Sequence, residues 1–127
     1  MHILIADDHK FVRDNLRAAI QQREPEWEIS EATDGREAVE QFVIRKPDVT
    51  VLDVVMTPVS GVAAAYDIRA LDPAAKIVFI SGHYTVKEAS FVIHLLGGAA
   101  FVPKTEAVTL LVPVITRCLT ENQRLLM

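Results

Sequence analysis

Three carboxylates, a hydroxyl and an ammonium group each follow a short apolar run. They belong to Asp7-Asp8, Asp53, Ser81 and Lys104. Carboxylates that lie close together repel one another unless a cation neutralises them, and oxygen ligands at a shallow, water-accessible site suit Mg²⁺. Together with a hydroxyl and an ammonium, such a site can hold a phosphoryl group while an oxygen attacks it. Asp53 is the natural nucleophile, because a carboxylate can form an acyl phosphate.

This chemistry requires a fold that brings the four stretches together. Short apolar runs alternate five times with helical patterns, which predicts a single α/β domain. We expect a doubly wound (βα)5 flavodoxin-like fold whose parallel five-stranded sheet has the order 2-1-3-4-5. The predicted strands are 3–6, 27–32, 49–55, 77–81 and 100–102. Function in such sheets collects at the carboxyl ends of the strands, so the polar groups are expected to converge there.

The helices are predicted from apolar spacing and from terminal signals. In the first helix the expected inward residues are Phe11, Leu16, Ala19 and Ile20, and the expected outward residues are Arg13, Asp14, Arg17 and Gln21. Capping-box spacing opens later helices at Asp34 and at Thr85, the second of these running through Leu96, and another helix is predicted over 62–71. Pro113 lacks an N–H, so the last helix is predicted from about Thr109 to Arg124, with Pro113 in its first turn.

The composition indicates one soluble globular domain. Of the 127 residues 50% are hydrophobic, and thirteen basic against seventeen acidic residues give a net charge of −4. This balance argues against direct binding of nucleic acid or of an anionic membrane surface. A single Cys excludes an internal disulfide, and neither a secretory signal nor a membrane-spanning run is present. We expect a cytoplasmic protein with a domain over 1–124 and a C-terminal end or linker start at 125–127.

The order and separation of these residues closely resemble the receiver domain of two-component response regulators. The matching motifs are Asp7-Asp8, Asp53 to Met56 with Gly61, Ser81-Gly82, Gly97, and Phe101 with Lys104. The match runs from about His2 to the final helix, which is nearly the whole chain. The stretch Asp7-Asp8-His9, with Val12-Arg13 soon after it, is similar to the subfamily whose output is often a helix-turn-helix DNA-binding domain.

The resemblance implies a phosphoacceptor regulator that is not an enzyme in the usual sense, since it catalyses only its own phosphorylation and dephosphorylation. A histidine kinase or a phosphotransfer protein would pass its phosphoryl group to Asp53. Ser81 and Lys104 would each bind a phosphoryl oxygen. The implied ligands of Mg²⁺ are Asp8 directly, Asp7 mainly through water, the Asp53 carboxylate and the Val55 backbone carbonyl.

The resemblance also implies a conformational switch. Ser81 would move toward the phosphoryl group, and Phe101 would turn inward into the space that Ser81 vacates. This movement would change the surface formed by the fourth helix, the fifth strand and the fifth helix, and so control an output, for which we expect transcription. DNA would be bound only by an output domain outside this chain, and the chain could also form a homodimer.

Two loops depart from the family pattern. Thr57 stands where the family commonly has Pro, and Pro58 follows one position late, which leaves the geometry of that loop open. Thr105 follows Lys104 where many relatives have Pro, so a cis peptide bond is not assured at that position.

The surroundings of the expected phosphoryl group depart from the pattern as well. Gly82 replaces the more usual Ala, which leaves the pocket open. Val55 and His83 stand at positions that influence the attacking water in relatives. Because the apolar Val55 would assist water less than a polar residue, we expect slow loss of the phosphoryl group.

Other residues that could carry chemistry are expected to be structural. His9 is expected only to open the first helix, His83 to lie in a surface loop, and His94 to have no ligand partner on its helix. Cys118 is expected to be an inert buried thiol. Trp27 begins an edge strand and is expected to cover the core.

Three other functions compete with the switch. A receiver that acts by binding alone would lack one of the acids, the hydroxyl or the lysine, and none is missing. A Mg²⁺-dependent phosphohydrolase would need a second acid two residues after the nucleophile, where Val55 stands, and a substrate cap for which 127 residues leave no room. A flavin carrier is excluded, because Asp7-Asp8 would repel phosphate.

Overall fold

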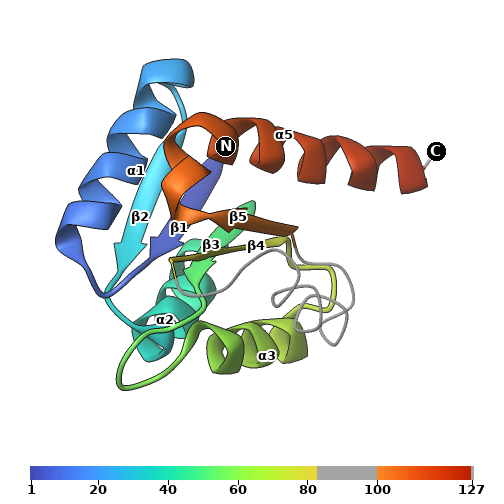
Figure 1. The fold of residues 1–127 in the computed structure, drawn as a ribbon. Coiled ribbons are helices and arrows are strands. Elements are labelled where there is room, and N and C mark those ends of the chain that lie inside the picture. The colour runs from blue at the N-terminus through green and yellow to red at the C-terminus, as the bar shows by residue number, and fades with distance from the viewer. Residues whose placement is uncertain (83–99, 127) are drawn as a thin grey trace.

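A parallel five-stranded sheet lies at the centre of the computed structural model, which describes residues 1–82 and 100–126 (Figure 1). The strand order β2-β1-β3-β4-β5 confirms the predicted doubly wound fold. The strands are β1 His2–Ala6, β2 Glu28–Ala32, β3 Val49–Asp53, β4 Ile77–Ser81 and β5 Ala100–Pro103. The helices are α1 Lys10–Arg23, α2 Gly35–Arg45, α3 Gly61–Leu71 and α5 Ala107–Leu126, with a 3₁₀ turn over Lys104–Glu106 before α5.

Several predictions concern the stretch between β4 and β5. The helix predicted from Thr85 to Leu96, the motif residue Gly97 and the two histidines His83 and His94 lie outside the described residues.

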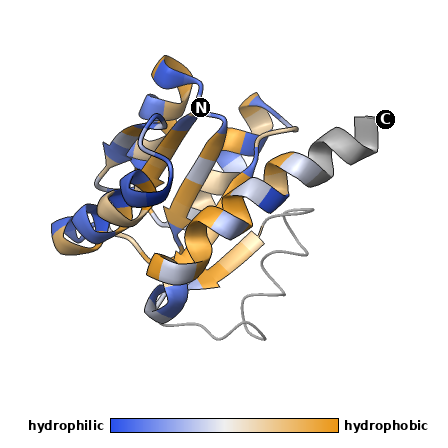
Figure 2. Cartoon of the chain, turned by 90° about the horizontal axis from the view of Figure 1, so that it is seen from above, coloured by the Kyte–Doolittle hydropathy of each residue, from blue (hydrophilic) through white to orange (hydrophobic). Residues whose placement is uncertain are grey.

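Helices cover both faces of the sheet, and this is why its central strands read as unbroken apolar runs. Successive side chains of a strand point to opposite faces. In β1, Ile3 and Ile5 pack into the layer formed with α1 and α5, whereas Leu4 and Ala6 pack into the layer formed with α2 and α3. The strands are accordingly mostly hydrophobic in Figure 2, and the hydrophilic residues lie mainly on helices and loops.

The edge strand β2 differs from the central strands, as its alternating sequence predicts. Only Ala32 at its end is buried, and the residues before it are partly or fully exposed. Trp27, directly before β2, is partly buried against the α1–α5 layer, which confirms that it covers the core.

The predicted inward face of α1 is partly wrong. Phe11 is 76% exposed, whereas Val12, Leu16 and Ile20 pack against the sheet. Residues four apart lie about 40° apart around a helix, but residues five apart lie about 140° apart. Phe11 therefore falls off the stripe that Leu16 and Ile20 define. Arg13 lies three residues before Leu16, at the flank of the same stripe, and is not a solvated residue: its side chain is only 12% exposed.

Side-chain caps begin the next two helices. The Asp34 carboxylate accepts a hydrogen bond from the Glu37 backbone N–H at 2.9 Å, which confirms the predicted start of α2. The Ser60 hydroxyl accepts one from the Ala63 N–H at 3.1 Å and begins α3 one residue earlier than predicted.

The start predicted for the last helix is wrong. The α-helix begins at Ala107, so Pro113 lies inside α5 rather than in its first turn. Pro113 cannot donate to the carbonyl four residues before it, which weakens the helix at that point. Its ring is exposed, while the neighbouring Leu111, Val112 and Ile115 are buried against the sheet. This burial of apolar surface keeps α5 continuous despite the proline.

Candidate functional site

The strand register brings the predicted site residues to one edge of the sheet. Ala6 of β1 lies opposite Leu52 of β3, so that Asp7 and Asp53 follow neighbouring strands at the same level. Ser81 of β4 lies opposite Pro103 of β5, and Lys104 comes directly after it. Carboxyl ends of parallel strands meet at one edge, as expected for this fold.

Asp7, Asp53 and Lys104 form a group of charges in which both carboxylates are buried and the lysine is partly buried. The Lys104 Nζ lies 2.8 Å from Asp7 Oδ2 and 2.9 Å from Asp53 Oδ2. The carboxylates of Asp7 and Asp53 are 0% and 1% exposed, and the lysine side chain is 20% exposed. Two buried carboxylates therefore share one ammonium group.

This sharing changes the protonation of both partners. Burial raises the pKa of Asp53 above its ordinary value, and the negative charge of Asp7 adds to the rise, while the hydrogen bond from Lys104 opposes it. Burial also acts to lower the pKa of Lys104, but its contacts with Asp7 and Asp53 outweigh that effect and leave the pKa raised. The ammonium thus stays charged at neutral pH and balances part of the acidic group.

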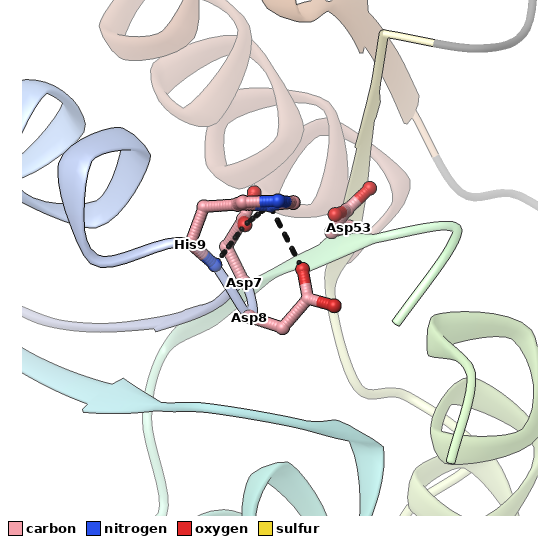
Figure 3. Close-up of side chains that lie close together, drawn as sticks. All are labelled: Asp7, Asp8, His9 and Asp53. Atoms are coloured by element: carbon pink, nitrogen blue, oxygen red, sulfur yellow. Dashed lines mark hydrogen bonds and ion pairs between the residues drawn. The ribbon is translucent and has the colours of Figure 1, made fainter. Parts of the chain in front are cut away.

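Asp8 and His9 complete the cluster on its outer side (Figure 3). The His9 backbone N–H donates to Asp7 Oδ1 at 2.8 Å. The His9 ring nitrogen Nδ1 lies 3.0 Å from Asp8 Oδ1 and 3.3 Å from Asp7 Oδ1. In Figure 3 the imidazole and the two carboxylates turn toward one another, with Asp53 beside them at the end of β3. His9 does begin α1 as its N-cap, but its ring also belongs to the acidic cluster, which the sequence reading missed.

The cluster has the donors and the charge that a divalent cation requires. Asp7, Asp8, His9 and Asp53 each offer a ligand atom, and these four atoms lie within 4.8 Å of one another. Three carboxylates against the one ammonium of Lys104 leave two negative charges among the residues in contact. Asp7 Oδ2 and Asp8 Oδ1 are buried, and within the described residues their partners are the Lys104 ammonium at 2.8 Å and the His9 ring at 3.0 Å. The three carboxylates therefore fit the Mg²⁺ ion that the sequence predicts.

Arg13 supports Asp7 from behind. Its guanidinium donates to the Asp7 backbone carbonyl at 2.7 Å and to the Glu31 carboxylate at 3.1 Å. Arg17 donates to the other oxygen of Glu31 at 2.6 Å. The Asp7 N–H in turn donates to the Ala32 carbonyl at 3.1 Å, so the backbone of Asp7 is held on both sides. The four-residue spacing of the two arginines is visible in the sequence, but their shared partner on β2 is not.

The loop after β3 lies directly against Asp53. The Val55 N–H donates to Asp53 Oδ1 at 3.3 Å, and the Val55 side chain is 40% exposed. The Thr57–Pro58 peptide bond is cis. Gly61 begins α3 so close to β3 that a Cβ there would overlap the Asp53 carbonyl oxygen. Gly61 is therefore required by this close approach of two backbone segments.

The two predicted switch residues occupy different environments. Ser81 is 1% exposed at the end of β4. Phe101 on β5 is partly buried and packs against the α2–α3 layer. Gly82, next to Ser81, is exposed, and a Cβ at this position would lie 3.7 Å from the Lys104 side chain, an ordinary contact distance.

The sequence and the fold both match known signalling proteins. The model of the response regulator receiver domain family matches residues 3–116. The chain is similar to the chemotaxis protein CheY of Thermotoga maritima, with 40% identity over 80 residues, 62% of this chain and 65% of that protein. It is also similar to the transcriptional regulatory protein DegU of Brevibacillus brevis, with 34% identity over 97 residues, 76% of this chain and 39% of that protein. The matched part is thus less than two thirds of either relative.

Solved structures of receiver domains also resemble this chain in fold. The receiver domain of NtrX from Brucella abortus has a TM-score of 0.82 and 27% identity, covering 93% of this chain and 98% of that domain. The response regulator domain of Thermotoga maritima CheB has a TM-score of 0.85 and 24% identity, covering 94% of this chain and 96% of that domain. Within the described ranges, no helix is both long and apolar enough to cross a lipid bilayer. By sequence and by fold, the chain belongs to the response regulator receiver domain family.

Proposed function

We propose that this chain is a phospho-accepting signalling switch that takes a phosphoryl group onto Asp53. The observation that carries this proposal is the buried Asp53 carboxylate, which contacts Lys104 at 2.9 Å and lies beside Asp7 and Asp8. Burial of so many charges is costly for a purely structural role. The same arrangement suits the formation of an acyl phosphate, because it combines a carboxylate nucleophile with the Lys104 ammonium for the transferred oxygens.

In the proposed reaction, an Asp53 carboxylate oxygen attacks the phosphorus of a phosphohistidine on a histidine kinase or a phosphotransfer protein. The P–O bond forms as the P–N bond breaks, and the electron pair of the broken bond stays on the imidazole nitrogen. Lys104 already contacts Asp53, and it would bind one phosphoryl oxygen. The Ser81 hydroxyl, at the end of the neighbouring strand, would bind another.

The metal ligands in this proposal are Asp8 directly, Asp7 mainly through water, the Asp53 carboxylate and the Val55 backbone carbonyl. Mg²⁺, when bound, supplies positive charge that neutralises the phosphoryl oxygens as the bond to phosphorus forms. Arg13 and the His9 N–H hold Asp7 in place for this task, through hydrogen bonds of 2.7 Å and 2.8 Å.

Phosphorylation is proposed to change a distant surface through Ser81 and Phe101. Ser81 would move toward the phosphoryl group, and Phe101 would turn inward into the vacated space. Phe101 is on β5, the strand that leads into α5, so this movement would alter the surface formed by β5, α5 and the helix predicted from Thr85 to Leu96.

Phosphorylation can be tested by intact-mass measurement after incubation with acetyl phosphate and Mg²⁺. We expect one added phosphoryl group, which hydroxylamine removes because the product is an acyl phosphate. Asp53→Asn should not be labelled. Asp67→Asn, which removes an exposed carboxylate on α3, should be labelled like the wild-type protein and serves as the matched control.

The same measurement separates the rival functions. A protein that binds Mg²⁺ but is never labelled would be a receiver that acts by binding alone. Rapid turnover of many phosphate esters would instead identify a phosphohydrolase. Persistence of the label would agree with the slow loss of the phosphoryl group that the apolar Val55 predicts.

We further propose that the output is transcription, carried out in the cytoplasm by a DNA-binding domain outside this chain. The similarity to DegU, a transcriptional regulatory protein, supports this choice. A response regulator of the LuxR family from Aurantimonas, with 27% identity and a TM-score of 0.77 over 91% of this chain, also supports it. The similarity to CheY favours a chemotaxis output instead. The full reading frame decides between them, because a transcription factor requires a DNA-binding segment after the receiver.

A further inference from the structure

The imidazole of His9 has no part in the proposed phosphoryl transfer, yet it faces the metal-binding carboxylates. Its Nδ1 lies 3.0 Å from Asp8 Oδ1 and 3.3 Å from Asp7 Oδ1 (Figure 3). An N-cap residue usually contributes through a side-chain hydrogen bond to its own helix, and His9 makes no such bond. Its ring is therefore directed to the acidic cluster rather than to α1.

The separations around Nδ1 include a hydrogen-bond distance to Asp7 Oδ1, and they also match those of neighbouring ligands on one metal ion. In an octahedral complex with metal–ligand bonds of about 2.1 Å, adjacent ligand atoms lie about 3.0 Å apart. The distances from Nδ1 to Asp8 Oδ1 and Asp7 Oδ1 are close to that value. One carboxylate oxygen of Asp53 belongs to the same group of four ligand atoms.

Lys104 leaves this face of the cluster open to an ion. It contacts the Oδ2 atoms of Asp7 and Asp53, whereas His9 faces the Oδ1 atoms of Asp7 and Asp8. Asp7 is the one carboxylate that both groups contact, and there the ammonium and the imidazole lie on different oxygens. The His9 side chain is 68% exposed, so an ion can reach it from solvent.

We propose that His9 is a nitrogen ligand through which this site binds a divalent transition-metal ion, such as Zn²⁺ or Mn²⁺, in addition to Mg²⁺. The inference rests on the metal site of the proposed function and adds a ligand to it. Mg²⁺ prefers oxygen ligands, whereas an imidazole nitrogen suits Zn²⁺ and the other divalent first-row metals. His9 therefore sets which ions compete for the site.

Metal affinities of the wild-type protein and of His9→Asn test this proposal. Asn keeps a preferred N-cap residue for α1 and removes the imidazole, and circular dichroism checks that the fold is retained. Calorimetric titration at one fixed pH should show Zn²⁺ affinity lowered by at least about tenfold, since even an outer-shell partner contributes that much. Mg²⁺ affinity should change by less than about twofold.

A spectroscopic measurement makes the nitrogen ligand directly visible. Pulsed electron paramagnetic resonance of the Mn²⁺-loaded protein should show coupling to an imidazole ¹⁴N nucleus, and His9→Asn should abolish it. His2→Gln is the matched control, because His2 bonds to Ser30 on the neighbouring strand at 2.6 Å and should leave the signal unchanged. Absence of the coupling in the wild-type protein, or equal losses of Mg²⁺ and Zn²⁺ affinity in His9→Asn, would overturn the proposal.

These results are separable from the test of phosphorylation. Asp53→Asn leaves His9, Asp7 and Asp8 in place, and it should retain the ¹⁴N coupling while losing the label from acetyl phosphate. A wild-type protein that shows the coupling but takes no label would refute the phosphoacceptor function and leave the nitrogen ligand standing. A protein that is labelled but shows no coupling would refute only the role of His9.

Discussion

Two buried carboxylates and one partly buried ammonium define the site at the scale of single residues. Asp7 and Asp53 are each within 2.9 Å of Lys104, so that two carboxylates share the single positive charge of one ammonium group. This imbalance destabilises the folded protein in the absence of a cation, because unneutralised charge is held away from water. The residues that are expected to perform the chemistry thus act against stability.

The raised pKa of Asp53 predicts how its replacement affects stability. Because burial raises the pKa of the native carboxyl above its unfolded value, the stability contributed by Asp53 is present at acid pH and is lost as the pH rises through the native pKa. In metal-free buffer at pH 7, Asp53→Asn should therefore be about 1 kcal/mol more stable than wild type. Denaturant unfolding at pH 7 and at pH 4 measures the difference, which should shrink at pH 4.

The control for this prediction is Asp67→Asn, which changes an exposed carboxylate and should leave the free energy of unfolding unchanged at both pH values. A stability gain that is the same at pH 4 and pH 7 would show that the charge of Asp53 is not its cause.

Removal of the shared ammonium should have the opposite effect. Lys104→Met leaves Asp7 and Asp53 buried without a cation, which should lower the free energy of unfolding by about 3 kcal/mol in metal-free buffer. Added Mg²⁺ should restore part of the loss, because the ion supplies the missing positive charge. Lys10→Met removes an exposed ion pair with Asp14 and should cost less than about 0.5 kcal/mol. Equal losses in the two variants would contradict the assigned role of Lys104.

Close backbone approach controls the site at the scale of elements. The start of α3 lies against the end of β3, and this contact positions the loop that carries Val55 beside Asp53. Gly61→Ala would push its Cβ into the Asp53 carbonyl oxygen, and we expect a loss of about 2 kcal/mol together with slower labelling by acetyl phosphate.

Gly82→Ala is the comparison for Gly61→Ala, because among the described residues its Cβ meets only the flexible Lys104 side chain, at 3.7 Å. Its stability should stay within about 0.5 kcal/mol of wild type. If thermal unfolding and labelling were equally affected in the two variants, the packing of α3 on β3 would not explain the glycine.

Pro113 provides a separate test of the last helix. Because its ring is exposed inside α5, Pro113→Ala restores a helical N–H without removing core contacts. Alanine favours the helix more than proline does, but it also gives the unfolded chain more conformational entropy. The first effect has the larger free energy, so we expect denaturant unfolding to show about 1 kcal/mol of added stability. Pro73→Ala, in the exposed segment after α3, should give no gain. A destabilised Pro113→Ala would mean that the proline fixes a bend that the packing of α5 needs.

Metal binding connects the site to the stability of the whole molecule. The carboxylates come from the ends of β1 and β3, 45 residues apart in the chain, and the unfolded protein does not hold them together. Mg²⁺ at about 100 times its dissociation constant should therefore raise the free energy of unfolding by about 2.7 kcal/mol. Thermal melts of wild type, Asp8→Asn and Asp67→Asn test this effect. Only Asp8→Asn should lose the response, and an unresponsive wild type would contradict the metal site.

Much of the site could be predicted because the fold follows from periodicity. Apolar runs such as Ile3–Ala6 predict strands buried on both faces, and parallel strands place their carboxyl ends at one edge. Once that edge is known, Asp7, Asp53 and Lys104 must lie near one another. The roles of His9 and Arg13 could not be predicted in this way, since each depends on where one side chain points after the strand has ended.

The sequence by itself predicted the class of fold from the alternation of apolar strands and helical patterns, and the edge at which the acids gather from their places after those strands. The strand order was predicted from the order usual for a doubly wound sheet of this size. Only the tertiary structure decided which side chains meet. It turned Phe11 outward, bound Arg13 to Asp7 and Glu31, and placed the His9 ring between two carboxylates. The physical reason is that periodicity describes the average face of a helix or strand, whereas contacts depend on angles of tens of degrees and on partners distant in the chain.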